Sequence, residues 1–256
     1  MLAKPKKYLG QHFLQDTTTM QRIVESLSFS NQYHTILEVG PGIGALTQFL
    51  VPKKTHAFYA IEVDATLVAY LKKHYPVLQA HIVEANFLQL QLDQLWPGPI
   101  AVIGNFPYNI ASQIFFKLLA ARDQVQEIVC MVQKEVAERI VANPGNKTYG
   151  IPSVCLQAFY EVQYLFTVGP TLFHPPPKVE SAVIRLQRNN TQKLPCQEAD
   201  FFKLVKLGFQ QRRKKLRNTL KTLGLPAHIQ QLAILDKRAE QLAVADFIAL
   251  AQQIAC

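Results

Sequence analysis

Short apolar runs alternate with amphipathic runs over the first half of the chain, and this alternation limits the fold more than any other feature. Each apolar run is rich in Val and Ile, and the stretches between them, such as residues 65–75, carry apolar side chains at helical spacing. The apolar runs cover residues 35–40, 57–64, 80–86, 100–105 and 127–133. Strands that alternate with helices form βαβ units, so this part of the chain predicts a parallel sheet.

Two more apolar runs follow, at residues 164–168 and 181–188, and a proline-rich loop without a helical pattern separates them. Two strands this close favour an antiparallel addition at the edge of the sheet. Beyond residue 190 the pattern is helical to the C-terminus. We therefore expect an α/β protein with a Rossmann-like, seven-stranded domain over residues 1–190 and a small helical domain over residues 191–256.

The composition excludes several classes of protein. The chain has 256 residues, of which 49% are hydrophobic, enough for a substantial core. Its apolar runs end well before the ~20 residues that span a bilayer, so we expect no membrane segment. The four cysteines form no CxxC pair and have no histidines at ligand spacing, which predicts neither a zinc site nor disulfides. We expect a cytoplasmic monomer that binds no metal and carries no cleavable targeting segment.

The charge of the chain is uneven. The formal net charge is +9, and residues 203–221 carry many cations and no acid. The cations of this segment are Lys203, Lys206, Arg212, Arg213, Lys214, Lys215, Arg217 and Lys221. Apolar residues near helical spacing predict a helix or helix pair with a cationic outer face. A solvated basic face is one interpretation, but clustering without acids favours binding to nucleic acid.

A glycine-rich turn, Gly40-Pro41-Gly42-Ile43-Gly44, follows the first strand of the predicted sheet. Glycines let the backbone turn tightly and approach a ligand, although a tight turn alone would also explain them. Glu62 ends the next strand, 22 residues beyond Gly40, where a carboxylate suits a ribose diol. The turn and the carboxylate together indicate a cofactor that contains adenosine. Asn86 and Phe87 end the third strand, where they could meet an adenine ring, although Asn86 could equally begin a loop.

The fourth strand ends in Asn105-Phe106-Pro107-Tyr108. The side-chain carbonyl of Asn105 and the main-chain carbonyl of Phe106 could converge on an amino group and aim its lone pair at an electrophilic methyl group, so that positioning supplies the catalysis. In this hypothesis Tyr108 stacks on an adenine base and Pro107 makes the turn rigid. A nicotinamide dinucleotide would suit the glycines but not this cluster, and the structural alternative is a helix-initiating turn with a core tyrosine.

The motifs resemble, in order and spacing over essentially the whole chain, those of the ribosomal RNA adenine dimethyltransferases, and most of all the members that act on the bacterial small subunit. The matching segments are KKYLGQHFLQD, GPGIG, EANF, NFPY, MVQKEVAERIVANPGNKTYG, LFHPPPKVESAVIRL and FQQRRKKLRNTL. The resemblance implies a class I methyltransferase domain that uses S-adenosylmethionine. It also implies dimethylation of two adjacent adenines near the 3′ end of small-subunit RNA, as part of subunit maturation.

The resemblance assigns roles to individual residues. It implies that Gly40, Gly42 and Gly44 pass close to the methionine and ribose parts of the cofactor, that Glu62 binds the ribose hydroxyls, and that Asn86 and Phe87 meet its adenine. His12 and Leu14 belong to a segment that closes over the cofactor, with His12 where the family more often has Asn. Asn86 stands where the family usually has Asp, so it can accept a hydrogen bond but lacks the charge.

For the substrate, the resemblance implies that Asn105, Phe106, Pro107 and Tyr108 hold the target adenine and that Phe173 covers its other face. Core packing is the alternative for Phe173. The residues expected to contact RNA are Lys147, Lys178, Arg212, Arg213, Lys214, Lys215 and Arg217. Two other functions stay open: a resistance-type methyltransferase of large-subunit RNA, which the proline-rich and basic motifs disfavour, and a non-enzymatic assembly factor, which the intact NFPY motif disfavours.

Overall fold

The structure is a computed structural model that describes residues 6, 10–53 and 55–254. The chain divides into two compact units, residues 1–137 with 163–188 and residues 138–162 with 189–256. The expected boundary at residue 190 lies beside the division at 188, but residues 138–162 group with the C-terminal helices and not with the first domain. The reason lies in packing, because helix α7 (Ile151–Gln157) packs against α8 (Glu198–Gln210) and α11 (Val244–Ile254).

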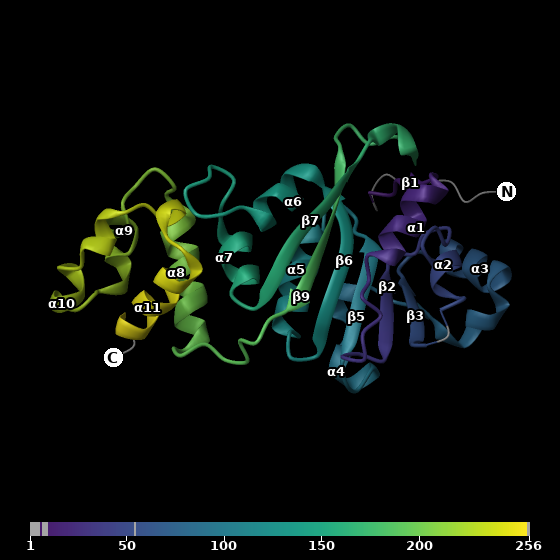
Figure 1. Ribbon diagram of the computed structural model, residues 1–256, viewed down its shortest axis with the longest axis horizontal. Coiled ribbons are helices and arrows are strands. Elements are labelled where there is room, and N and C mark those ends of the chain that lie inside the picture. Colours follow the sequence, from purple (N-terminus) through teal and green to yellow (C-terminus); the bar gives the residue numbers. More distant parts are fainter. Residues whose placement is uncertain (1–5, 7–9, 54, 255–256) are drawn as a thin grey trace. The chain divides into compact units, whose positions relative to one another are not determined.

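A seven-stranded sheet forms the centre of the first unit, in the order β4-β3-β2-β5-β6-β9-β7 (Figure 1). The strands are β2 (Thr35–Val39), β3 (Ala57–Glu62), β4 (Ile82–Glu84), β5 (Ile100–Asn105), β6 (Val125–Gln133), β7 (Tyr160–Val168) and β9 (Ser181–Arg188). The strands from β4 to β6 pair in parallel, and β9 pairs antiparallel with β6. The seven-stranded sheet and its antiparallel addition are thus confirmed.

Helices connect the strands. The α-helices of this part of the chain are α1 (Thr17–Glu25), α2 (Thr47–Leu50), α3 (Ala65–His74), α4 (Leu92–Leu95), α5 (Ala111–Ala120) and α6 (Lys134–Val141). Short 3-10 helices lie at η2 (Pro76–His81), η3 (Phe87–Gln89) and η4 (Pro170–Leu172). Side-chain caps define where the longer helices begin: Asp16 accepts a hydrogen bond from the Thr19 amide, and Asp64 accepts one from the Thr66 amide.

The core of the first unit lies around the central strands. Ile36, Ile103 and Met131 come from β2, β5 and β6 and belong to one apolar cluster with residues of α1, α2 and α3. Strands covered on both faces explain why these runs are apolar throughout instead of alternating.

A second, two-stranded sheet was not expected. It joins β1 (Phe13–Leu14) to β8 (Phe173–His174) in antiparallel pairing, with Leu14 opposite Phe173. Two-residue strands leave no periodic signal in a sequence, so this pairing could not be predicted from the pattern.

The second unit is helical. Besides α7, α8 and α11 it contains α9 (Leu216–Thr219), α10 (Ala227–Gln230) and the 3-10 helices η5 (Lys221–Leu223), η6 (Ala233–Asp236) and η7 (Ala239–Gln241). Helices α8 and α11 pack through Phe209 and Phe247, whose rings stack with centroids 5.9 Å apart. Gly208 of α8 lies close to α9, because a Cβ there would be 3.1 Å from the Leu216 side chain. None of the helices in the described part of the chain could cross a membrane.

Candidate active site

A cavity of about 260 Å³ lies where the parallel strands end. Its walls come from residues 10–14, 38–42, 45–46, 61–63, 85–88 and 105–110. From β2 the chain proceeds through β3 to β4 and then returns to β5 on the other side of β2, so the connections leave β2 and β5 in opposite directions. Open α/β sheets bind ligands at the carboxyl ends of strands at such a position. The segments that the sequence singled out therefore meet around one cavity.

The glycine turn forms one wall of this cavity. Gly40 and Gly42 have φ values of 70° and 61°, which side chains rarely adopt. A Cβ at Gly42 would also lie 3.2 Å from the Phe13 ring. Gly44 differs, because it does not line the cavity and a Cβ there would lie 2.6 Å from the Tyr75 ring. Packing against Tyr75 is thus sufficient to explain this glycine, and its approach to the cofactor stays a prediction.

Glu62 ends β3 beside the glycine turn and is 5% exposed. Its Oε1 accepts hydrogen bonds from the amides of Val63 and Asp64, both at 3.0 Å, and its Oε2 accepts one from the Gly42 amide at 3.1 Å. A carboxylate has about four lone-pair sites, so one position on Oε2 remains for a ligand. Burial raises the pKa of Glu62 despite these three donors.

Glu38 is a cavity residue to which the sequence assigned no role. It is 1% exposed, and the Thr47 hydroxyl donates to its Oε2 at 2.6 Å. Burial raises the pKa of Glu38 to about 8, and the nearby charge of Glu62 acts in the same direction. The signal was available, because Glu38 is an acid inside an apolar strand, two residues before Gly40.

Asn86 and Phe87 lie at the end of the cavity formed by residues 85–88. The Asn86 Oδ1 accepts a hydrogen bond from the Leu88 amide at 3.0 Å, so this residue caps η3 as the loop-starting alternative anticipated. It also lines the cavity, and its side-chain oxygen keeps a second lone pair. Phe87 is buried and contributes an apolar wall.

The end of β5 brings the polar and aromatic cluster to the opposite part of the cavity. The Asn105 Nδ2 donates to the main-chain oxygen of His12 at 3.1 Å, which leaves the Asn105 Oδ1 as an acceptor for a ligand. The Phe106 ring is fully buried against Phe115, with centroids 5.7 Å apart, so only its main chain can serve the cavity. The Tyr108 hydroxyl lies 2.5 Å from the Ser181 Oγ.

His12 covers one side of this cluster. Its ring stacks on the Tyr108 ring with centroids 5.6 Å apart and an interplanar angle of 27°. Its Nδ1 lies 2.8 Å from the Pro175 carbonyl oxygen and must be protonated to donate there. Leu14 is buried beside it and lines the cavity. The segment expected to close over a cofactor thus forms a wall of the cavity.

Phe173 is not among the residues that line the cavity. It is 4% exposed, pairs with Leu14 through the β1–β8 sheet and belongs to the main apolar cluster. These contacts agree with the core-packing alternative, and coverage of the target base by Phe173 stays a prediction.

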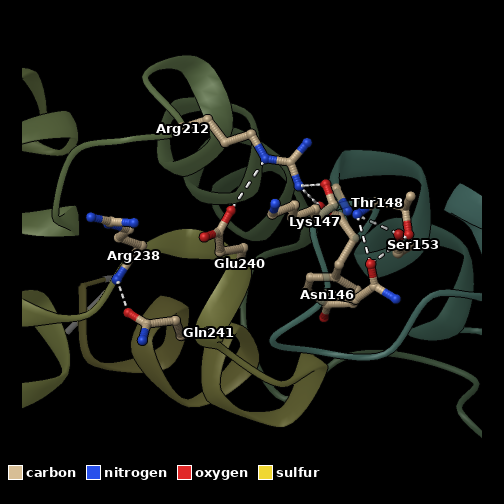
Figure 2. A network of polar contacts seen from close by, with 10 residues as sticks. Asn146, Lys147, Thr148, Ser153, Arg212, Arg238, Glu240 and Gln241 are labelled. Carbon is tan, nitrogen blue, oxygen red and sulfur yellow. Dashed lines mark hydrogen bonds and ion pairs between the residues drawn. The ribbon is translucent and has the colours of Figure 1, made fainter.

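The basic residues divide into two groups. Arg212 bridges two parts of the second unit: its Nε donates to Glu240 Oε2 at 3.2 Å, and its Nη2 donates to the carbonyls of Lys147 and Tyr149 (Figure 2). Arg217 and Lys215 both pair with Asp236, at 3.1 and 3.3 Å. These three cations pair with groups of the protein itself, but their side chains stay 40–58% exposed, so the expected phosphate contacts stay a prediction.

The second group faces solvent. The side chains of Lys147, Lys178, Arg213 and Lys214 are exposed and form no ion pair with the described residues. Arg213 and Lys214 lie in the turn between α8 and α9, and the Arg212 bridge fixes the backbone of Lys147. Within the described residues, no three His, Cys, Asp or Glu side chains gather as metal ligands would.

Comparisons with known proteins agree over the length of the chain. A family model described as "Ribosomal RNA adenine dimethylase" matches residues 2–255. A "Ribosomal RNA small subunit methyltransferase A" from Cytophaga hutchinsonii is 50% identical over 251 residues, which cover 98% of this chain and 97% of that protein. The protein of the same name from Bacteroides thetaiotaomicron is 52% identical over 255 residues, with 99% and 95% covered.

Two solved structures resemble the chain over most of its length. The chain resembles a dimethyladenosine transferase from Plasmodium falciparum with a TM-score of 0.79 and 25% identity, over 93% of this chain and 96% of that one. It resembles the 23S rRNA methyltransferase ErmE with a TM-score of 0.66 and 26% identity, over 94% and 100%.

Proposed function

Because the chain belongs to the ribosomal RNA adenine dimethylase family, we propose that it transfers methyl groups from S-adenosylmethionine to the exocyclic amino groups of two adjacent adenines near the 3′ end of small-subunit ribosomal RNA. Relatives about half identical to it over nearly their whole length carry the name of the small-subunit enzyme, which supports this substrate. The proposal includes a cytoplasmic role in maturation of the small subunit.

The cavity residues suit such a cofactor. S-adenosylmethionine supplies an electrophilic methyl group on a sulfonium, together with a ribose and an adenine. In the proposal Glu62 accepts a hydrogen bond from the ribose through its remaining lone pair, and the Gly40–Gly42 backbone lies against the ribose and methionine parts. Asn86 and Phe87 suit the adenine, because one offers a polar atom and the other an apolar wall.

One observation carries the catalytic part of the proposal: the Asn105 amide donates to the His12 carbonyl and so presents its oxygen as an acceptor. An adenine amino group is a poor nucleophile because its lone pair is delocalised into the ring. Two carbonyl oxygens, from the Asn105 side chain and the Phe106 main chain, would hold its hydrogens and direct the lone pair toward the methyl group. Tyr108 would stack on the base, and Pro107 would limit the motion of the turn.

A second candidate is methylation of large-subunit RNA, which the likeness to the 23S rRNA methyltransferase ErmE keeps in view. The higher identity to proteins named for the small subunit favours the first candidate. A non-enzymatic assembly factor would need no ordered acceptor site such as Asn105 provides.

The deciding experiment offers unmethylated small and large subunits separately to the purified protein with isotopically labelled S-adenosylmethionine and then maps the modified nucleotides. We expect two dimethylated adenines in the small-subunit RNA. Label in the large subunit alone would establish the second candidate, and no label in either subunit would support the assembly factor.

A further inference from the structure

The N-terminal strap, which we define as residues 10–14, lines the cavity and is attached to the rest of the first unit by contacts far apart in the sequence. Leu14 pairs with Phe173 in the small sheet. The His12 carbonyl accepts the hydrogen bond from Asn105. The third attachment is to Asp64, a residue outside the cavity lining that the proposed reaction does not use.

Asp64 connects this strap to the cofactor loop. The Gln11 Nε2 donates to Asp64 Oδ2 at 3.3 Å, and the Lys6 Nζ pairs with Asp64 Oδ1 at 2.7 Å. The Asp64 amide in turn donates to Glu62 Oε1 at 3.0 Å. The Asp64 side chain is 2% exposed, whereas that of its partner Lys6 is 36% exposed. A short chain of contacts therefore runs from the proposed ribose-binding carboxylate through Asp64 to the strap, and from the strap to Asn105.

Helix capping explains only part of this arrangement. Asp64 caps α3 through Oδ1, which accepts from the Thr66 amide at 3.0 Å. One oxygen is enough for a cap, and serine caps nearly as well as aspartate. The second oxygen, Oδ2, reaches Gln11 instead. The hydrogen bond between Asp64 Oδ2 and Gln11 is therefore an interaction that helix capping does not require.

We propose that Asp64 is a positioning residue that holds the strap closed over the cofactor cavity and thereby couples cofactor binding to the orientation of the Asn105 amide. The identity of the ligand rests on the proposed function. A ligand that binds only the closed form has an apparent Kd equal to the intrinsic Kd divided by the closed fraction, so releasing the strap weakens binding without removing any ligand contact. A released strap also moves the His12 carbonyl away from Asn105 and leaves that amide free to turn.

The test compares variants on the two sides of the latch. Asp64→Ser keeps the cap but cannot reach Gln11, and Gln11→Ala removes the partner and leaves the cap intact. Because Gln11 itself lines the cavity, its affinity loss is assigned to the latch only if the double variant shows no further loss. The matched control is Gln21→Ala, because Gln21 donates to Glu25 at 2.7 Å within α1 and takes no part in the cavity. Calorimetry measures S-adenosylmethionine affinity, and hydrogen exchange without ligand measures the closure of the strap.

For Asp64→Ser and Gln11→Ala we expect affinity to fall about tenfold and the amides of residues 13–15 to exchange faster, with α3 unchanged. The double variant should bind about as weakly as either single variant, because both remove the same latch. Gln21→Ala should match the wild type.

Wild-type affinity in both variants would overturn the latch, and so would additive losses in the double variant. Faster exchange throughout α3 in Asp64→Ser would assign its effect to the cap, and an unchanged Gln11→Ala would then overturn the proposal. A wild-type protein that does not bind S-adenosylmethionine would contradict the proposed function, while faster strap exchange in the two variants would still support the latch.

Discussion

At the scale of single residues, the Asn105 amide shows how one hydrogen bond sets the chemistry of a site. An amide has a donor end and an acceptor end, and the strap occupies the donor end through the His12 carbonyl. A strand-ending asparagine without that partner could turn either way. In our proposal, the orientation of the Asn105 amide therefore depends on a contact between residues 93 positions apart.

Replacing Asn105 by alanine should reduce turnover by about 10²–10³, the usual effect of losing a hydrogen bond made to the reacting group. Cofactor affinity should change less than about threefold. Single-turnover methylation and calorimetry measure the two quantities separately. Asn105→Asp serves as a control, because a carboxylate cannot donate to the His12 carbonyl and should be similarly inactive. Equal losses of turnover and affinity would assign Asn105 to the cofactor pocket.

Glu38 should make stability depend on pH. Its pKa rises from 4.5 to about 8 because burial disfavours the charged form. The stabilising effect of the neutral group is therefore complete below about pH 4.5 and is lost as pH rises toward 8, because only the unfolded chain ionises in that range. Urea unfolding of wild type and Glu38→Gln should show the variant gaining about 4 kcal/mol relative to wild type between pH 5 and pH 8, and little more from pH 8 to pH 9, since each pKa unit corresponds to about 1.4 kcal/mol. If the unfolding free energies of the two proteins change in parallel with pH, Glu38 is already ionised in the folded protein at pH 5.

Phe173→Ala should lower the free energy of unfolding by about 3–5 kcal/mol, because a buried ring is removed from the core. Phe173→Leu retains most of the apolar volume, so it should recover most of the stability and also the methylation rate. Thermal unfolding and initial rates on small subunits measure both. A stable but inactive leucine variant would restore the idea that this ring covers the target base.

At the scale of elements, the turn between α8 and α9 combines two kinds of cation. Arg212 is committed to Glu240 and to the loop carbonyls, whereas Arg213 and Lys214 project from the same turn without such partners among the described residues. The helix pair expected from the apolar spacing is present, with Val205 and Leu216 buried. Arg212 therefore stabilises the second unit, whereas in our proposal Arg213 and Lys214 of the same turn bind RNA.

The double change Arg213→Gln and Lys214→Gln should flatten the salt dependence of RNA binding by about 1.4–1.8 in log–log slope, since each lost phosphate contact contributes about 0.7–0.9. Its melting temperature should stay near that of wild type. Arg212→Gln should lower the melting temperature and change the slope less. Fluorescence titrations over a salt series, with a thermal melt of each variant, test this. If Arg212→Gln gives the larger change in slope, Arg212 contacts the RNA phosphates and Arg213 and Lys214 do not.

At the scale of the whole molecule, the net charge of +9 attracts any polyanion and does not choose among RNAs. In our proposal, choice requires several phosphate contacts and the acceptor site to be satisfied at once, and a folded ribonucleoprotein can provide these together. The charge provides attraction, and the shape of the substrate provides specificity.

An assembled, unmethylated small subunit should therefore be methylated at least about tenfold faster than a short naked hairpin with the same adenines, since several contacts act together only on the subunit. Initial rates at one salt concentration, with both substrates below saturation, compare them. Equal rates would return substrate choice to the adenine pocket.

The sequence was sufficient for those features that depend on local pattern. Apolar runs rich in Val and Ile predicted the seven strands. The absence of a helical pattern between the last two runs predicted an antiparallel strand pair at the edge of the sheet. Gly40, Glu62 and Asn105 could be placed at one edge because parallel strands end on the same side of a sheet. Each of these inferences uses backbone periodicity or the residue that directly follows a strand.

Other features depend on which surface lies opposite a residue, and no local pattern records that. Phe173 is core because Leu14 pairs with it, Gly44 is required by Tyr75, and Arg212 is occupied by carbonyls more than 60 positions away. Residues 138–162 join the second unit because α7 packs on α8. Aromatic rings, glycines and arginines suit both binding and packing, so folding, which brings distant segments together, determines which of the two each one serves.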